Sequence, residues 1–309
     1  MTGQTLLITG ANGFVGAHVA ATAAAAGHTV WAVGRESEPT GALGPHISEY
    51  FSADLEHVWE FPTGPDAIVH LAGLAAVGPS FDNPQQYLNV NSGIMTRMSE
   101  ALIRERSRAR VVVVSSGSVY APPVAQELIT EDSPVVPSSP YAVAKILVET
   151  QAAYYAERGL DTVIARPFNH IGPGQGPGFL VPDLTAALQE LNEGENLRVG
   201  NLAAARDYTD VRDVSRAYLT LAFAPGHKHH VYNVASGASH TGHAILETIA
   251  DALERQLPTL EVDPSRFRPT DPAVITGSAS RLSDEFGWAP TIPWQQSVRE
   301  FATLTATAS

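Results

Sequence analysis

The stretch that decides the fold is Thr5-Leu-Leu-Ile-Thr9 followed by Gly10-Ala-Asn-Gly13-Phe-Val-Gly16. A short apolar run ends at Thr9, and an alanine-rich helical pattern then continues to Gly27. Glycines between a strand and a helix let the backbone approach a pyrophosphate, and the first N–H groups of the helix can donate to it. The spacing G-x-x-G-x-x-G only approximates the usual fingerprint, so a simple turn is the alternative. We favour a dinucleotide site formed by Gly10, Asn12, Gly13, Phe14, Val15 and Gly16.

Further short apolar runs alternate with helical patterns in the first half of the chain. We predict strands at Thr29–Val33, Ala67–His70, Val111–Ser115 and Asp161–Ala165, and helices at about Pro84–Arg106 and Pro140–Arg158. This alternation predicts an α/β fold with a doubly wound parallel Rossmann sheet. After Arg166 the pattern is less regular, and Gly172-Pro-Gly-Gln-Gly-Pro-Gly178 is a loop by composition. We expect a dinucleotide-binding domain over residues 1–169 and a smaller α/β substrate domain over residues 170–309, with elements crossing back.

The composition excludes several classes of function. The chain has 309 residues, of which 44% are hydrophobic, enough for one large or two modest packed units. A formal charge of −13 disfavours nonspecific binding to nucleic acid or to an anionic membrane. The chain has no cysteine, which excludes disulfides, thiolate metal sites and cysteine nucleophiles. No apolar run approaches the ~18–20 residues of a membrane span and no signal-peptide pattern precedes Thr5, so we expect a cytoplasmic protein.

A group of histidines, His227, His229 and His230, raises the question of a metal site. The run Gly226-His-Lys-His-His230 has no carboxylate nearby in the sequence, and it follows Pro225. A solvated loop is therefore the better interpretation, and we expect no metal there.

A second informative stretch is Tyr141-Ala-Val-Ala-Lys145. Ser139 and Pro140 suit the start of a helix, and Gly159 suits its end. Residues four apart share one face of a helix, so the Lys145 ammonium can stabilise a Tyr141 phenolate. A phenol titrating near pH ~10 needs such help to exchange protons at neutral pH. Taken alone, the same spacing also fits an ordinary amphipathic helix.

The residues after the second predicted strand bear on the choice of cofactor. A carboxylate there typically binds the ribose hydroxyl of NAD, whereas an arginine accommodates the 2′-phosphate of NADP. The sequence is Val33-Gly34-Arg35-Glu36, with no acid at the strand tip and a competing acid one residue beyond Arg35. We favour NADP(H) with Arg35 as the phosphate contact. NAD(H) with Glu36 is the alternative, and Arg35 could equally be a solvated surface charge.

Together these stretches resemble the extended short-chain dehydrogenases/reductases that act on nucleotide sugars, the NAD-dependent epimerase/dehydratase family. Further motifs that carry the resemblance are Ala53-Asp-Leu55, Val69-His-Leu-Ala-Gly73, Asn89-Val-Asn91, Ser115-Ser-Gly-Ser-Val-Tyr120, Arg166-Pro-Phe-Asn169 and Arg206-Asp-Tyr-Thr-Asp210. The resemblance covers nearly the whole chain. It implies that Ser116, Tyr141 and Lys145 are catalytic. It also implies cofactor contacts from Asp54, Leu55, Leu71, Ala72, Gly73 and Asn89, in addition to Tyr141 and Lys145.

The same resemblance implies a nucleotide-sugar substrate and a homodimer formed through the helices near Pro84–Arg106 and Pro140–Arg158. The substrate contacts that it implies are Ser118, Asn169, Arg206 and Arg268. The planar fork of donors in arginine suits a diphosphate, although each arginine taken singly could be a surface charge. His170 is either a further substrate contact or a structural loop histidine.

One departure from the family pattern bears on the reaction. Members that dehydrate sugars carry one or two acids directly after the catalytic Ser or Thr, whereas this chain has Gly117 and Ser118, so we do not expect dehydration. Arg166–Gln175 and Gly178–Asp183 are most similar to the GDP-4-keto-6-deoxymannose reductases, which use NADPH. We therefore predict reduction of the C4 keto group of a nucleotide-4-keto-6-deoxyhexose. The alternatives are a nucleotide-sugar 4-epimerase with retained NAD and, from another class, a non-catalytic dinucleotide sensor.

Overall fold

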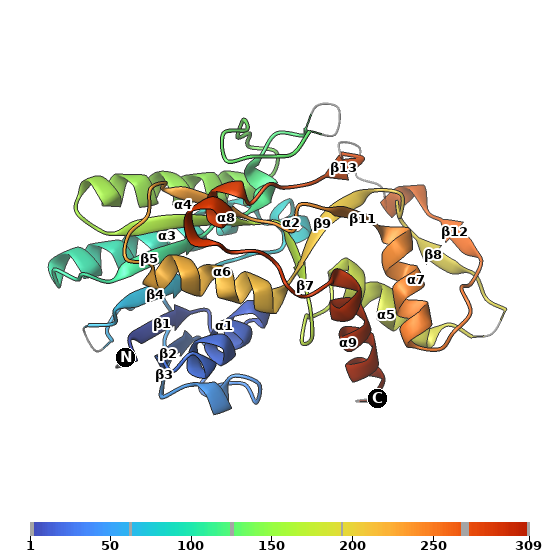
Figure 1. The fold of residues 1–309 in the computed structure, drawn as a ribbon, viewed down its shortest axis with the longest axis horizontal. Helices are drawn as coiled ribbons and strands as arrows, with labels where there is room; N and C mark the ends of the chain where they lie inside the picture. Colours follow the sequence, from blue (N-terminus) through green and yellow to red (C-terminus); the bar gives the residue numbers. More distant parts are fainter. Residues whose placement is uncertain (1–2, 62–63, 124–126, 193, 267–271, 308–309) are drawn as a thin grey trace.

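A parallel seven-stranded sheet is the largest element in the computed structural model, which describes residues 3–61, 64–123, 127–192, 194–266 and 272–307 (Figure 1). Its strands lie in the order β10 (Val231–Val234), β6 (Thr162–Pro167), β5 (Arg110–Val114), β4 (Ala67–His70), β1 (Thr5–Thr9), β2 (Thr29–Gly34) and β3 (Glu49–Ser52). Each pair of neighbouring strands is parallel. The predicted doubly wound Rossmann sheet is confirmed.

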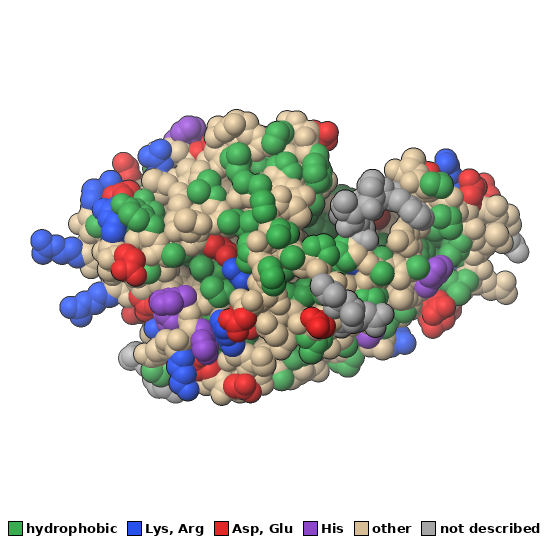
Figure 2. All heavy atoms as spheres, turned by 90° about the horizontal axis from the view of Figure 1, so that it is seen from above, with side chains coloured by type: hydrophobic (Ala, Val, Ile, Leu, Met, Phe, Trp, Pro, Cys, Tyr) green, Lys and Arg blue, Asp and Glu red, His purple; other side chains and the backbone are tan. Residues whose placement is uncertain are grey.

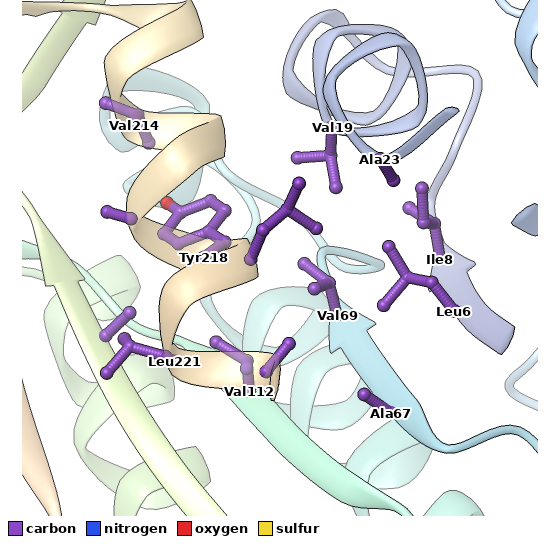
Figure 3. Close-up of a cluster of buried hydrophobic side chains, with 14 of the residues drawn as sticks. Leu6, Ile8, Val19, Ala23, Ala67, Val69, Val112, Val214, Tyr218 and Leu221 are labelled. Atoms are coloured by element: carbon purple, nitrogen blue, oxygen red, sulfur yellow. The ribbon is translucent and has the colours of Figure 1, made fainter. Parts of the chain in front are cut away.

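Helices cover both faces of this sheet. α1 (Phe14–Ala25) and α6 (Val211–Phe223) lie on one face, and α3 (Pro84–Arg104) and α4 (Pro140–Glu157) lie on the other (Figure 1). Successive side chains of a strand point to opposite faces. Leu6 and Ile8 therefore pack toward α1 and α6, where Tyr218 is also buried, as Figure 3 shows. Leu7 packs on the opposite side with α3 and α4. Burial on both faces explains why these strands are nearly continuous apolar runs.

The start of α4 is fixed as the sequence predicts. Ser139 Oγ accepts a hydrogen bond from the backbone N–H of Ala142 at 3.1 Å, and Pro140 occupies the first helical position. Gly159 follows the helix with a φ of +99°, a left-handed conformation that glycine adopts at little cost. The cap holds Tyr141 in the first turn of the helix, at the carboxyl edge of the sheet.

A smaller lobe is built from residues that follow β6. In it β9 (Ala205–Asp210) pairs with β7 (Asn169–Ile171), β11 (Ser239–Thr241) and β13 (Val274–Ile275), and β8 (Leu197–Val199) pairs with β12 (Leu260–Val262). Its helices are α5 (Leu180–Glu190), α7 (Gly242–Ala252) and α9 (Trp294–Thr307), which enclose a separate apolar core (Figure 1). The short elements of the chain are η1 (Gly44–His46), α2 (Val77–Ser80), η2 (Gly117–Val119), η3 (Pro264–Arg266) and α8 (Ser280–Phe286).

Several elements from the second half of the chain return to the large sheet. β10 extends that sheet beside β6, α6 covers one of its faces, and α8 lies against β10 through the Tyr232 and Phe286 rings, whose centroids are 5.5 Å apart. The two lobes therefore do not correspond to two continuous segments of the sequence. The division into residues 1–169 and 170–309 stays a prediction.

Candidate active site

The candidate site lies where the parallel strands end. The glycine turn follows β1, Arg35 follows β2, Leu71–Gly73 follow β4, Ser116 follows β5 and Asn169 follows β6. The strand order reverses between β1 and β4, and open α/β sheets bind their ligands at such a switch point. Figure 2 shows that the surface is hollowed between the larger lobe and the smaller one.

The glycine turn is shaped as a dinucleotide requires. Gly10 has a φ of +68°, and a Cβ atom there would lie 2.8 Å from the backbone nitrogen of Ala72. A Cβ atom at Gly16 would lie 2.4 Å from the carbonyl oxygen of Ala11. α1 begins directly after Gly13, and none of the described side chains caps its first turn. The turn thus combines close backbone approach with free helix N–H donors, so these residues fit a pyrophosphate.

Asn12 connects the glycine turn to the end of β2. Its Nδ2 donates to Glu36 Oε2 at 2.9 Å and to Tyr50 Oη at 3.0 Å, and its Oδ1 accepts from Thr40 N at 2.9 Å. The hydrogen bond from Asn12 lowers the pKa of the Glu36 carboxyl, which is therefore an anion at neutral pH. Arg35 is exposed beside it. Both residues that bear on the cofactor choice thus lie at this end of the sheet, and the carboxylate faces the turn.

The segment after β4 is held from two sides. Thr9 Oγ1 accepts from the backbone N–H of Ala72 at 3.2 Å and lies 2.8 Å from His70 Nδ1. From α3, Asn91 Oδ1 accepts from Leu74 N at 2.8 Å, and Asn91 Nδ2 donates to Leu74 O at 3.2 Å. A Cβ atom at Gly73 would lie 2.4 Å from Asn91 Oδ1, so a glycine is required there.

Asn89 was predicted as a cofactor contact, and Asn91, two residues later, is hydrogen-bonded to the segment after β4. Asn89 lies on the exposed side of α3, where its Oδ1 accepts from Gln85 Nε2 at 2.8 Å. Asn91 lies three and four residues before the buried Ile94 and Met95, so helical periodicity places it on the core face. That periodicity could have identified it. Of the other expected cofactor contacts, Leu55 is buried, and Asp54 is exposed and accepts from Glu56 N at 3.0 Å.

The three residues expected to be catalytic lie together. Ser116 caps η2, and its Oγ accepts from Ser118 N at 3.1 Å. The Ser116 side chain lies close enough to the Tyr141 hydroxyl to lower its pKa, against the larger effect of burial. Lys145 lies one helical turn after Tyr141, with its Nζ 5.9 Å from the centroid of the Tyr141 ring, and it donates to Val114 O at 2.9 Å. The end of β5 and the first turns of α4 therefore form one constellation.

Burial sets the protonation states of this constellation. It raises the pKa of the Tyr141 hydroxyl to about 12, against a smaller opposite effect from Ser116. It lowers the pKa of Lys145 to about 8, and the Glu149 carboxylate opposes that change. Burial and the Lys145 charge lower the pKa of His70 to about 3, so this histidine is neutral. At pH 7 Tyr141 therefore keeps its proton and Lys145 keeps its charge, which is the arrangement of a proton donor beside a cation.

Three of the four expected substrate contacts lie among the described residues, on η2, β7 and β9. Ser118 is exposed, and its Oγ lies 3.1 Å from Ser116 Oγ. Asn169 is exposed at the start of β7. Arg206 is half-buried on β9 and donates through Nη1 to Ala205 O at 2.7 Å. Arg268 lies outside the described residues.

His170 and the histidine cluster have structural contacts. The His170 ring stacks on Phe14, with centroids 6.1 Å apart, and burial lowers its pKa. His227 Nε2 lies 3.1 Å from Asp161 Oδ1, so the fold supplies a carboxylate that is distant in sequence. Within the described residues there is no group of three His, Asp or Glu that could hold a metal ion. Nor does the described part of the chain contain a helix long and apolar enough to span a membrane.

Comparison with known proteins gives one consistent result. Residues 6–235 match the NAD dependent epimerase/dehydratase family. GDP-6-deoxy-D-mannose reductase of Pseudomonas aeruginosa is 36% identical over 96% of this chain and 95% of that protein. The solved structure of RMD from P. aeruginosa complexed with NADPH superposes with a TM-score of 0.82 at 30% identity, covering 99% of this chain and 100% of that one. For UDP-glucose 4-epimerase of Thermus thermophilus in complex with NAD the TM-score is 0.85 at 25% identity, with the same coverage of 99% and 100%.

Proposed function

The chain belongs to the NAD dependent epimerase/dehydratase family, and we propose that it reduces the C4 keto group of a nucleotide-4-keto-6-deoxyhexose with NADPH. It is an NAD(P)-dependent oxidoreductase of the extended short-chain dehydrogenase/reductase type. The name of the P. aeruginosa relative, which is 36% identical, and the NADPH in the RMD structure support the reductase.

The observation that carries the proposal is the placement of Tyr141 and Lys145 one helical turn apart on α4, with the Lys145 Nζ 5.9 Å from the centroid of the Tyr141 ring. A tyrosine whose pKa is about 12 holds its proton at neutral pH and can give it to an oxygen that is becoming an alkoxide. Ser116 donates a hydrogen bond to the same carbonyl oxygen, and the Lys145 ammonium stabilises the phenolate that remains. The bound nicotinamide supplies the hydride. These groups suffice for carbonyl reduction.

The residues after Ser116 argue against elimination of water. Gly117 and Ser118 offer no carboxyl group with a pKa suited to that chemistry. There is also little space for a side chain at position 117, because a Cβ atom on Gly117 would lie 3.2 Å from Cγ of Phe168. A longer acidic side chain there would require the Phe168 ring to move.

The binding residues follow from the same proposal. The glycine turn binds the pyrophosphate, Arg35 the 2′-phosphate, and the segments at Asp54–Leu55, Leu71–Gly73 and Asn89 the remainder of the cofactor. The nucleotide sugar is bound by Ser118, Asn169, Arg206 and Arg268. Arginine suits the diphosphate because its planar fork of donors matches phosphate oxygens.

The test is NADPH absorbance with pre-formed GDP-, dTDP- and UDP-4-keto-6-deoxyhexoses. We expect NADPH to be consumed with at least one of them and the product to gain two hydrogens. GDP-mannose and dTDP-glucose serve as controls, because they lack the keto group and we expect no dehydration of either by this protein. Absence of NADPH oxidation with all three keto sugars would overturn the proposal.

A 4-epimerase with retained NAD is the second candidate, and the Glu36 carboxylate favours it. That anion faces the glycine turn through its hydrogen bond from Asn12, where a carboxylate suits a ribose hydroxyl better than a 2′-phosphate. Acid precipitation of freshly purified protein would separate the candidates. Stoichiometric NAD in the supernatant favours the epimerase, whereas little NAD and exchangeable NADP favour the reductase.

We further propose a homodimer formed through α3 and α4, in a cytoplasmic protein. Val143 and Leu147, four residues apart on α4, are 37% and 38% exposed, and Tyr154 on the same side is 56% exposed. Figure 2 shows hydrophobic side chains gathered on this side of the larger lobe, as expected of an interface. Leu147→Glu should give a monomer in size-exclusion chromatography with light scattering, whereas Leu257→Glu, at a leucine that is 51% exposed, should not. Cell fractionation tests the location.

A further inference from the structure

Glu149 is a buried carboxylate that the proposed chemistry does not use. It is 9% exposed and lies four residues after Lys145, so the two side chains share one face of α4. Its Oε1 accepts hydrogen bonds from Ser115 Oγ and, at 2.8 Å, from Arg166 Nε, and its Oε2 accepts from Arg166 Nη2 at 2.6 Å. A buried carboxylate needs such partners, and here both oxygens have them.

The pair of Glu149 and Arg166 is connected to other strands by a chain of hydrogen bonds between polar side chains. Arg166 Nη1 donates to Tyr120 Oη at 2.9 Å, and Tyr120 Oη donates to Asn233 Oδ1 at 2.7 Å. Asn233 Nδ2 donates in turn to Ile129 O at 3.2 Å and to Ser278 O at 3.1 Å. Glu149 is therefore fixed by contacts that reach β5, β6 and β10. A buried network in which each member has partners specifies one geometry.

We propose that Glu149 is a positioning residue, which keeps the Lys145 ammonium charged and fixes the backbone at Ser115 that carries Ser116. The inference rests on the proposed function, because that function gives the Lys145 charge and the Ser116 hydroxyl their roles. Glu149 itself touches neither substrate nor cofactor. It acts through one neighbour on its own helix and one at the end of β5.

The surroundings of Lys145 explain why a carboxylate is needed. His70 faces Lys145 from β4 and is neutral, Tyr141 faces it from the preceding turn and is protonated, and Val114 of β5 offers a carbonyl oxygen. Glu149 is the group whose negative charge opposes the effect of burial on Lys145. Buried lysines without such compensation titrate as low as pH ~5–6 and would be neutral in the cell. With Glu149 present, the ammonium persists at pH 7.

The composition of the chain allows the charge of Lys145 to be measured directly. The sequence contains two lysines, Lys145 and the exposed Lys228. Lys228→Arg therefore leaves a single lysine, and labelling lysine with ¹³C at Cε gives one signal whose shift reports the Lys145 charge. In this background we expect a titration midpoint at about pH 8. Adding Glu149→Gln, which preserves shape and removes the charge, should lower the midpoint by about one pH unit.

Glu100→Gln is the matched control. Glu100 also pairs with an arginine, Arg158, but this arginine directly follows α4 at the end opposite Tyr141, so the Lys145 midpoint should not change. A merely structural role for Glu149 would leave the midpoint unchanged as well, and that result would overturn the proposal. If Glu149→Gln does not fold, the proposal is tested by the titration midpoint of Lys145 in the Lys228→Arg variant. A midpoint nearer pH 8 than pH 7 supports the proposal, and one nearer pH 7 or below it overturns the proposal.

The titration needs neither substrate nor NADPH. Failure of the keto-sugar assay would therefore count against the proposed function alone, whereas an unchanged midpoint would count against the role of Glu149 alone. Ser115→Ala tests the second half of the inference. It removes the hydroxyl that donates to Glu149 and keeps the charge, so turnover should fall while the Lys145 midpoint stays near that of the background. Unchanged turnover in Ser115→Ala would remove the contact to β5 from the proposal.

Discussion

The charge of Lys145 gives the most quantitative prediction, a loss of activity at alkaline pH. Lys145 is 8% exposed and its pKa is lowered to about 8, whereas the pKa of Tyr141 is raised to about 12. As the pH rises through 8 the ammonium is lost, while the tyrosine still holds its proton. About nine-tenths of Lys145 is charged one unit below its pKa and about one-tenth one unit above it. We therefore expect kcat/KM for NADPH, which reports the free enzyme, to fall about tenfold between pH 7 and pH 9.

Two variants isolate the residue responsible for this fall. Lys145→Arg replaces the ammonium by a guanidinium that stays charged, so its activity, although lower, should be independent of pH over that range. Lys228→Arg changes the other lysine of the chain, which is exposed, and should retain the wild-type profile. The rates are measured by NADPH absorbance with pre-formed keto sugar in buffers of constant ionic strength. A wild-type profile that stays flat to about pH 10, or a fall that persists in Lys145→Arg, would refute the reasoning.

Three substitutions test other parts of the account. Tyr141→Phe removes the proton donor and keeps the ring, so turnover should fall by roughly 10²–10⁴ while NADPH still binds in fluorescence titration; wild-type rates would contradict the assignment. Arg35→Ala should weaken NADPH by about 1.5–3 kcal/mol and NADH much less, and an equal loss for both would return Glu36 and NAD to favour. Gly16→Ala places a Cβ atom 2.4 Å from Ala11 O, so unfolding in urea should show a loss of about 1–3 kcal/mol, whereas unchanged stability would show that the turn can open.

The sequence predicts the central strands well because their patterns are local. The predicted bounds of β1 and β4 match the structure, and β2, β5 and β6 differ by one or two residues. β3 (Glu49–Ser52) is an edge strand with no buried residue, so it has no apolar run to detect. β10 (Val231–Val234) carries Asn233 in its middle, which is satisfied by Ile129 and Ser278 from distant segments. Contacts of that range leave no pattern in the strand itself.

In the candidate site, too, local patterns can be predicted from the sequence, whereas contacts between distant segments cannot. Tyr141 and Lys145 share a helix, and Ser116 follows the clearest strand, so spacing and resemblance together bring them to one place. Contacts between distant segments are different in kind. The hydrogen bond from Asn12 to Glu36 joins residues 24 apart in the chain. The pair of Arg166 with Glu149 joins a strand to a helix, and no spacing rule indicates it.

The reductase assignment is tested most directly by following the hydride. The measurement uses NADPH deuterated at both C4 positions of the nicotinamide, pre-formed GDP-4-keto-6-deoxymannose and mass and NMR analysis of the product. A reductase that uses Tyr141 as proton donor gives a product with one deuterium bound to sugar C4 and a new hydroxyl hydrogen, and it oxidises one NADPH for each product formed. A sugar nucleotide with altered stereochemistry, no deuterium at C4 and no oxidised NADPH would contradict the account.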